Sequence, residues 1–167
     1  KPENVMLVQT GEQEDFVKVL DFGIAKIRLD GDHQEGLTRA GLVFGTPEYM
    51  SPEQAMGHEA DARSDLYTLG IMLYDMCVGH SPFHHEDLTA MLTAQITEPT
   101  PELPENVPPK LATLIHQLTE KDPAKRPQSA VELADLFFEV AEKMAWQLPA
   151  PRTSAGTRLD VLRRSSV

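Results

Sequence analysis

Residues 64–78 (SDLYTLGIMLYDMCV) carry apolar side chains around nearly the whole circumference of a helix, and this feature constrains the fold most strongly. A helix with one apolar stripe lies on a protein surface, whereas a helix that is apolar all round must be enclosed by other elements. Gly79 follows directly and favours termination, because glycine adopts the left-handed backbone conformation without strain. The sequence therefore predicts a central helix over residues 64–78. A chain of 167 residues is long enough to bury one core around it.

Further helices are expected after the central one. Residues 86–96 predict a helix, and the five prolines of residues 98–109 predict an extended connection after it. Four apolar residues then follow the spacing of an amphipathic helix: Leu111, Leu114, Ile115 and Leu118. Ser129 and Glu132 have the spacing of a capping box, in which each side chain bonds the backbone N–H of the other residue. This pattern predicts a last helix that continues to about residue 146.

The N-terminal part of the chain has β character. Residues 5–8 and 16–20 are rich in β-favouring residues, and a polar loop over residues 10–15 separates them, which predicts a hairpin. Residues 21–63 show no sustained period, and an irregular segment of this length in a compact domain is usually functional or disordered. The expected fold class is mainly α, a helical bundle around a buried central helix with a small β-hairpin at one edge.

Charge and composition exclude several classes of function. Acidic residues outnumber basic ones by 26 to 15, so binding of nucleic acid through its phosphates is not expected. The single cysteine excludes an internal disulfide framework, and no apolar run reaches the length of a membrane span. We expect a cytoplasmic domain over residues 1–147. The basic residues 148–167 have few large apolar side chains, and we interpret them as a flexible tail or linker.

Two short segments carry residue types that suit a metal-bound phosphate. Asp21-Phe22-Gly23 directly follows the second predicted strand, where a carboxylate is well placed to hold a hard cation such as magnesium. Lys1 and Asn4 come just before the first strand, so a hairpin would bring Asn4 close to Asp21. An amide oxygen, a carboxylate and a lysine together fit a magnesium-bound phosphate. The alternative is an ordinary turn that Asn4 and Asp21 cap.

Five segments, in this order, resemble the C-terminal lobe of a eukaryotic-type serine/threonine protein kinase. Their residues are typical of the bacterial, Hanks-type members of that family. The five segments are KPEN at residues 1–4, DFG at 21–23, GTPEYMSPE at 45–53, SDLYTLG at 64–70 and KDPAKRP at 121–127. Each segment alone is a weak signal, but five in the same order and approximate spacing are highly specific. The resemblance covers roughly residues 1–145 and implies the mainly helical α+β fold of that lobe.

The resemblance implies ATP and Mg²⁺ as cofactors and assigns residues to them. Lys1, Glu3, Asn4 and Asp21 would form this lobe's part of the nucleotide site, with Asn4 and Asp21 as the metal ligands. Lys1 would neutralise charge on the transferred phosphoryl group. The protein substrate would present a Ser or Thr hydroxyl, and Thr46 would face that hydroxyl and order the catalytic loop.

The remaining assignments concern the activation segment and its anchoring. Phe22 and Gly23 would open that segment, and Thr38 is either a phosphorylation site or a solvated loop threonine. Glu53 and Arg126 match a buried ion pair that anchors the end of the segment. Asp65 matches the residue that ties the catalytic loop to the central helix.

Several parts of the family pattern have no match in the chain. The catalytic aspartate would fall two positions before Lys1, and the glycine-rich loop and the strand lysine of the N-terminal lobe also have no counterpart. We expect the missing N-terminal lobe to be a partner of this lobe. An alternative is a non-catalytic, kinase-like binding module that presents a docking groove near residues 80–110. An unrelated helical adaptor would leave the five ordered motifs unexplained.

We predict that this chain by itself transfers no phosphate, because half of the nucleotide site and the catalytic aspartate are absent from it. The measurement uses radiolabelled ATP and a generic basic protein as substrate. Turnover above an enzyme-free blank that persists in an Asp21→Ala variant would contradict both this prediction and the assignment of Asp21.

Overall fold

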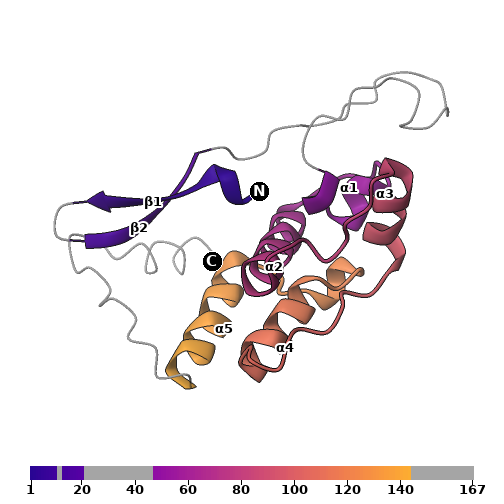
Figure 1. The fold of residues 1–167 in the computed structure, drawn as a ribbon. Helices are drawn as coiled ribbons and strands as arrows, with labels where there is room; N and C mark the ends of the chain where they lie inside the picture. The colour runs from indigo at the N-terminus through magenta and orange to yellow at the C-terminus, as the bar shows by residue number, and fades with distance from the viewer. Residues whose placement is uncertain (11–12, 21–46, 144–167) are drawn as a thin grey trace, which may run out of the picture.

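The computed structural model describes residues 1–10, 13–20 and 47–143, which form a mainly helical lobe with a two-stranded antiparallel sheet (Figure 1). This confirms the predicted fold class. Residues 11–12 of the predicted polar loop and the predicted tail lie outside the described residues. The described elements, in chain order, are η1 (Pro2–Asn4), β1 (Val5–Thr10), β2 (Gln13–Val19), η2 (Pro47–Tyr49), α1 (Pro52–Ala55), α2 (Ala62–Val78), α3 (Leu88–Thr97), α4 (Pro109–Leu118), η3 (Pro123–Lys125) and α5 (Ala130–Lys143).

The hairpin of β1 and β2 is longer than the sequence predicts. Val5 pairs with Val19 and Thr10 with Gln13, so polar residues assigned to the loop belong to the strands instead. The register shifts between Val8 and Thr10, which is where one strand carries an irregularity. Exposed apolar side chains lie on both faces of this hairpin: Met6, Leu7, Phe16, Val17 and Val19.

Helix α2 occupies the centre of the helical part, and its two sides serve two separate cores. Leu66 and Tyr74 pack into a large cluster with residues of α4 and α5. Tyr67 and Ile71, both fully buried, pack with Phe83 on the other side. Two buried sides explain why the sequence of this helix is apolar nearly all round.

The ends of α2 are set by local chemistry. Asp61 caps the N-terminus by accepting a hydrogen bond from the backbone N–H of Arg63 at 2.8 Å. Gly79 ends the helix with a φ of 92°, and its N–H donates to the carbonyl of Asp75 at 2.7 Å. The predicted stop at Gly79 is therefore confirmed, because that left-handed conformation is strained for residues with a Cβ.

The predicted amphipathic helix is α4, and its apolar stripe is buried in the large cluster: Leu111, Leu114, Ile115 and Leu118. Helix α3 begins at Leu88, two residues later than the predicted start, because Asp87 caps it through the N–H of Ala90. Residues 98–108, which connect α3 to α4, form neither helix nor strand, as the prolines predict.

The start of α5 differs in one detail from the prediction. Ser129 Oγ accepts the backbone N–H of Glu132 at 3.1 Å, which is one half of the predicted capping box. The carboxylate of Glu132 accepts the backbone N–H of Gln128 at 2.8 Å, one residue before the expected partner. The complete capping box of the described chain is found at α1 instead, between Ser51 and Gln54.

Among the residues that the structure describes, none of the helices combines the length and the apolar character that crossing a membrane requires.

We predict that Gly70→Ala destabilises the lobe, because α2 and the end of α4 approach too closely for a side chain at this position. An added Cβ would lie 2.6 Å from Leu118 Cβ and 2.9 Å from Thr119 Cγ2. Overpacking of this kind costs about 1–3 kcal/mol, which outweighs a helix-propensity gain of about 0.5–1 kcal/mol. Urea unfolding measures the loss. Met76→Ala, on the exposed side of the same helix, is the control and should change the stability little. Equal stability of Gly70→Ala and wild type would contradict this packing.

Candidate functional site

The N-terminal residues of the candidate nucleotide site lie at the base of the hairpin. Lys1 and Glu3 are exposed, and Asn4 is half-buried. The backbone N–H of Asn4 donates to the carbonyl of Lys1 at 2.9 Å, which closes the short η1 turn. The carbonyl of Asn4 accepts the N–H of Leu20, also at 2.9 Å. The hairpin therefore brings Asn4 next to the residue that directly precedes Asp21 in the sequence.

Several predicted site residues lie outside the described residues: Asp21, Phe22, Gly23, Thr38 and Thr46. The assignments of these residues stay predictions. The described chain resumes at Pro47, one residue after Thr46.

The segment that follows Thr46 is held on α2 by Tyr49. Its hydroxyl donates to Asp75 Oδ2 at 2.8 Å, and its carbonyl accepts Thr68 Oγ1 at 2.9 Å. Asp75 and Thr68 both belong to α2, two turns apart. Burial, together with the neighbouring carboxylate of Asp75, raises the pKa of Tyr49 well above its usual range. The tyrosine is therefore a neutral hydrogen-bond donor at physiological pH.

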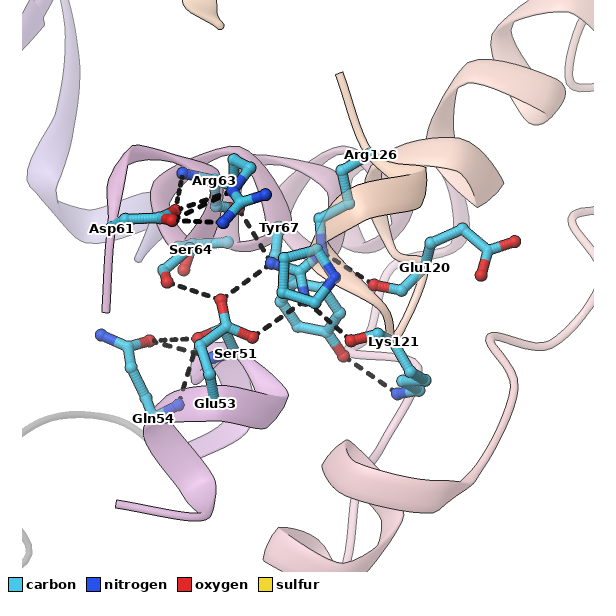
Figure 2. Close-up of polar contacts among 12 residues, drawn as sticks. Ser51, Glu53, Gln54, Asp61, Arg63, Ser64, Tyr67, Glu120, Lys121 and Arg126 are labelled. Carbon is cyan, nitrogen blue, oxygen red and sulfur yellow. Dashed lines mark hydrogen bonds and ion pairs between the residues drawn. The ribbon is translucent and has the colours of Figure 1, made fainter. Parts of the chain in front are cut away.

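Glu53 and Arg126 form a bidentate ion pair, so the predicted contact is present although the two residues are 73 positions apart (Figure 2). Arg126 Nη1 donates to Glu53 Oε1 at 2.8 Å, and Nη2 donates to Oε2 at 2.9 Å. The arginine is 2% exposed and the glutamate 8%. Ser64 Oγ, in the first turn of α2, donates a further hydrogen bond to Glu53 Oε1 at 2.5 Å.

Every N–H of the Arg126 guanidinium has an acceptor. Two are used by the Glu53 carboxylate, and backbone carbonyls accept the others: Nε donates to Glu120 at 2.8 Å, Nη1 to Arg63 at 3.0 Å and Nη2 to Lys121 at 3.1 Å. A guanidinium has five N–H donors, so this buried charge is fully hydrogen-bonded. Its carbon also lies 4.9 Å from the centre of the Tyr67 ring, within the range of a cation–π contact.

The environment of Glu53 favours its charged form. Burial by itself raises the pKa of the carboxyl, but hydrogen bonds from Arg126 and Ser64 outweigh it and lower the pKa from 4.5 to about 2. Glu53 is therefore ionised across the physiological range, and Arg126 always faces a carboxylate.

Asp65 lies in the first turn of α2, and the residue as a whole is exposed to solvent. Partial burial of its carboxyl raises the pKa of Asp65. Its predicted role, tying the catalytic loop to the central helix, stays a prediction.

Sequence reasoning missed a second polar cluster beside the ion pair. Tyr67 OH donates to Gln95 Oε1 at 2.7 Å, and Lys121 Nζ donates to Tyr67 OH at 3.0 Å. Burial, followed by the charge of Arg126, lowers the pKa of Lys121 to about 8. One signal was available: Met91, Ala94 and Gln95 share the i, i+3, i+4 spacing of one helix face, which predicts a buried glutamine.

We predict that breaking the Glu53–Arg126 pair destabilises the lobe by about 3–5 kcal/mol, because removal of either partner leaves an uncompensated buried charge. The test is a double-mutant cycle of Glu53→Gln, Arg126→Met and the double variant, measured by urea unfolding. We expect the double variant to lose much less than the sum of the single losses. Strictly additive losses would show that the two side chains have no energetic coupling.

The surface pair of Arg63 and Asp61, with Nη2 and Oδ2 2.6 Å apart, provides the control. Arg63→Met should cost much less, because water solvates both charges. The pH dependence gives a second readout. The lowered pKa of Glu53 contributes stability that is present above pH 4.5 and is lost as the pH falls towards 2. Glu53→Gln should abolish that part of the acid dependence.

Comparison with known proteins agrees with this geometry. The sequence model of the protein kinase domain matches residues 1–138. The chain is 44% identical to the serine/threonine-protein kinase pkn3 of Myxococcus xanthus over 162 residues, which cover 94% of this chain and 30% of that protein. It is 39% identical to the serine/threonine-protein kinase PknA of Mycobacterium tuberculosis over 140 residues, which cover 84% of this chain and 31% of that protein.

The chain thus spans about a third of the length of these curated relatives. The similarity covers most of the chain. The observed ion pair of Glu53 and Arg126 joins two of the five motifs on which the resemblance rests. The chain therefore belongs to the protein kinase family, among the serine/threonine kinases of the type found in bacteria.

Proposed function

We propose that the full-length protein transfers the γ-phosphate of ATP to Ser or Thr hydroxyls of protein substrates. Residues 1–147 would supply the magnesium-binding, activation and substrate-binding segments of that kinase. The observation that carries the proposal is the hydrogen bond from the Leu20 N–H to the Asn4 carbonyl. It brings the end of the first motif beside the residue that precedes the second, as a shared metal site formed by Asn4 and Asp21 requires.

The donor set at this site fits Mg²⁺ and a nucleotide phosphate. Asn4 and Asp21 would offer an amide oxygen and a carboxylate, the hard ligands that magnesium prefers. Lys1 is exposed at the same end of the hairpin, where its ammonium would neutralise phosphate charge. Glu3 lies between them and would complete this edge of the site. Bound Mg²⁺ would neutralise the charge that develops on the transferred phosphoryl group.

The last part of the activation segment would hold the protein substrate. Thr46 would face the substrate hydroxyl, and the chain directly after it is fixed to α2 through Tyr49. The buried pair of Glu53 and Arg126 supports this assignment, because it anchors the same stretch of chain to the helical core. Asp65, in the first turn of α2, would tie the catalytic loop to this helix.

The hairpin offers a surface for the N-terminal lobe. Apolar side chains on both of its faces are about half exposed, including Leu7 at 63% and Val17 at 55%. An apolar surface of this kind on a small sheet indicates a covering partner. We propose that the N-terminal lobe of the full-length protein covers it and supplies the remaining nucleotide contacts.

We predict that Asp21→Asn in the full-length protein lowers the rate of phosphate transfer by at least about a hundredfold, because even indirect partners of metal ligands contribute about ten- to a hundredfold. The substitution keeps the size of the side chain and removes the charge that holds the metal. The rate is measured with radiolabelled ATP at ordinary magnesium concentration, and the melting temperature should stay close to that of the wild type.

The control is Asp135→Asn, which removes the same charge from an exposed position on α5 and should leave the rate unchanged. A near-normal rate of Asp21→Asn at ordinary magnesium concentration would make Asp21 a turn residue. A folded full-length wild type that transfers no phosphate would instead favour the non-catalytic binding module, with its surface near residues 80–110.

A further inference from the structure

A chain of hydrogen bonds links the connection between α4 and α5 to the segment that follows Thr46. Lys121 Nζ donates to Tyr67 OH at 3.0 Å, and Tyr67 OH donates to Gln95 Oε1 at 2.7 Å. Gln95 Nε2 then donates to the backbone carbonyl of Glu48 at 2.7 Å. A second, longer contact of 3.5 Å joins Gln95 Nε2 to the carbonyl of Pro47.

The direction of these bonds is set from both ends. Lys121 only donates, so Tyr67 must accept from it and direct its own proton to Gln95. A backbone carbonyl only accepts, so the amide nitrogen of Gln95 must face Glu48. The side chain of Gln95 therefore has one orientation that satisfies all of its neighbours, and reversal of the amide would set donor against donor and acceptor against acceptor.

The chain of bonds lies in the protein interior. Gln95 and Tyr67 are 0% exposed, and water cannot replace a lost partner of either side chain. Lys121 Nζ also donates to the carbonyl of Gln95 at 2.8 Å and lies 4.0 Å from the centre of the Phe83 ring. The lysine thus bonds the backbone of the glutamine directly and its side chain through Tyr67, and the lowered pKa of Lys121 agrees with this enclosed position.

We propose that Gln95 is a positioning residue for the protein substrate, because its side chain fixes the backbone of Pro47 and Glu48 directly after Thr46. This inference rests on the proposed function, in which Thr46 faces the substrate hydroxyl. Gln95 touches neither the nucleotide nor the candidate metal ligands. Its loss should therefore weaken the use of protein substrate and leave the use of ATP unchanged.

The first test measures hydrogen exchange of the amides of Glu48, Tyr49 and Met50 in the full-length protein. Gln95→Met keeps the length of the side chain and removes its donor and acceptor. We expect exchange at these amides to become roughly fivefold faster, since a net hydrogen bond changes an opening equilibrium by about this factor. Thr97→Ala, an exposed position on α3, is the control and should leave exchange there unchanged.

Tyr67→Phe is the second variant, and it removes a single oxygen atom from the same chain of bonds. It should shift the exchange in the same direction, which keeps the test decisive if Gln95→Met fails to fold. Unchanged exchange at the three amides in the folded variants would overturn the proposal.

The second test separates substrate from nucleotide by steady-state kinetics. In Gln95→Met we expect the KM for the protein substrate to rise about fivefold and the KM for ATP to stay within about twofold, because only the substrate segment loses a hydrogen bond. A parallel rise of both constants, or an unchanged KM for protein, would overturn the assignment to substrate. Absence of phosphate transfer in the wild type would defeat the proposed function and this kinetic role, while the exchange test still decides whether Gln95 positions the segment.

Discussion

The buried ion pair of Glu53 and Arg126 is the interaction on which the rest of the lobe depends. A guanidinium in the protein interior must have an acceptor for each of its five donors, or its desolvation is not compensated. Arg126 meets this requirement only when α1, the first turn of α2 and the carbonyls of Glu120 and Lys121 are all in place. Residues 53–64 and residues 120–126, which are distant in sequence, are therefore held in one arrangement.

Helix α2 extends the effect of this anchor to the candidate substrate surface. One of its sides packs on α4 and α5, and the other receives Tyr49 through Asp75 and Thr68. Tyr67 belongs to both polar clusters, since its ring faces Arg126 and its hydroxyl bonds Gln95. The segment after Thr46 thus rests on a helix whose own position is set by the core, and this rigidity suits a surface that must present a hydroxyl group in a fixed place.

The hairpin is held together by different interactions from those of the helical part. Its two strands pair with each other, and most of their apolar side chains stay exposed instead of entering either helical cluster. The hydrogen bond between Leu20 and Asn4 orders the base of the hairpin locally. The candidate site at this edge is consequently built from short-range contacts, whereas the proposed substrate surface is built from long-range ones.

The sequence by itself determined the features that depend on neighbours within about one helical turn. The apolar α2, its stop at Gly79 and the buried stripe of α4 all follow from periodicity and backbone preference. The pairing of Glu53 with Arg126 could be predicted only through the family resemblance, because spacing along the chain carries no information about a contact 73 positions away. The tertiary structure alone decided that Lys121 lies over Phe83 and that Gln95 bonds the backbone of Glu48. In both cases several partners were chemically equivalent, and only the packed fold brought one of them within reach.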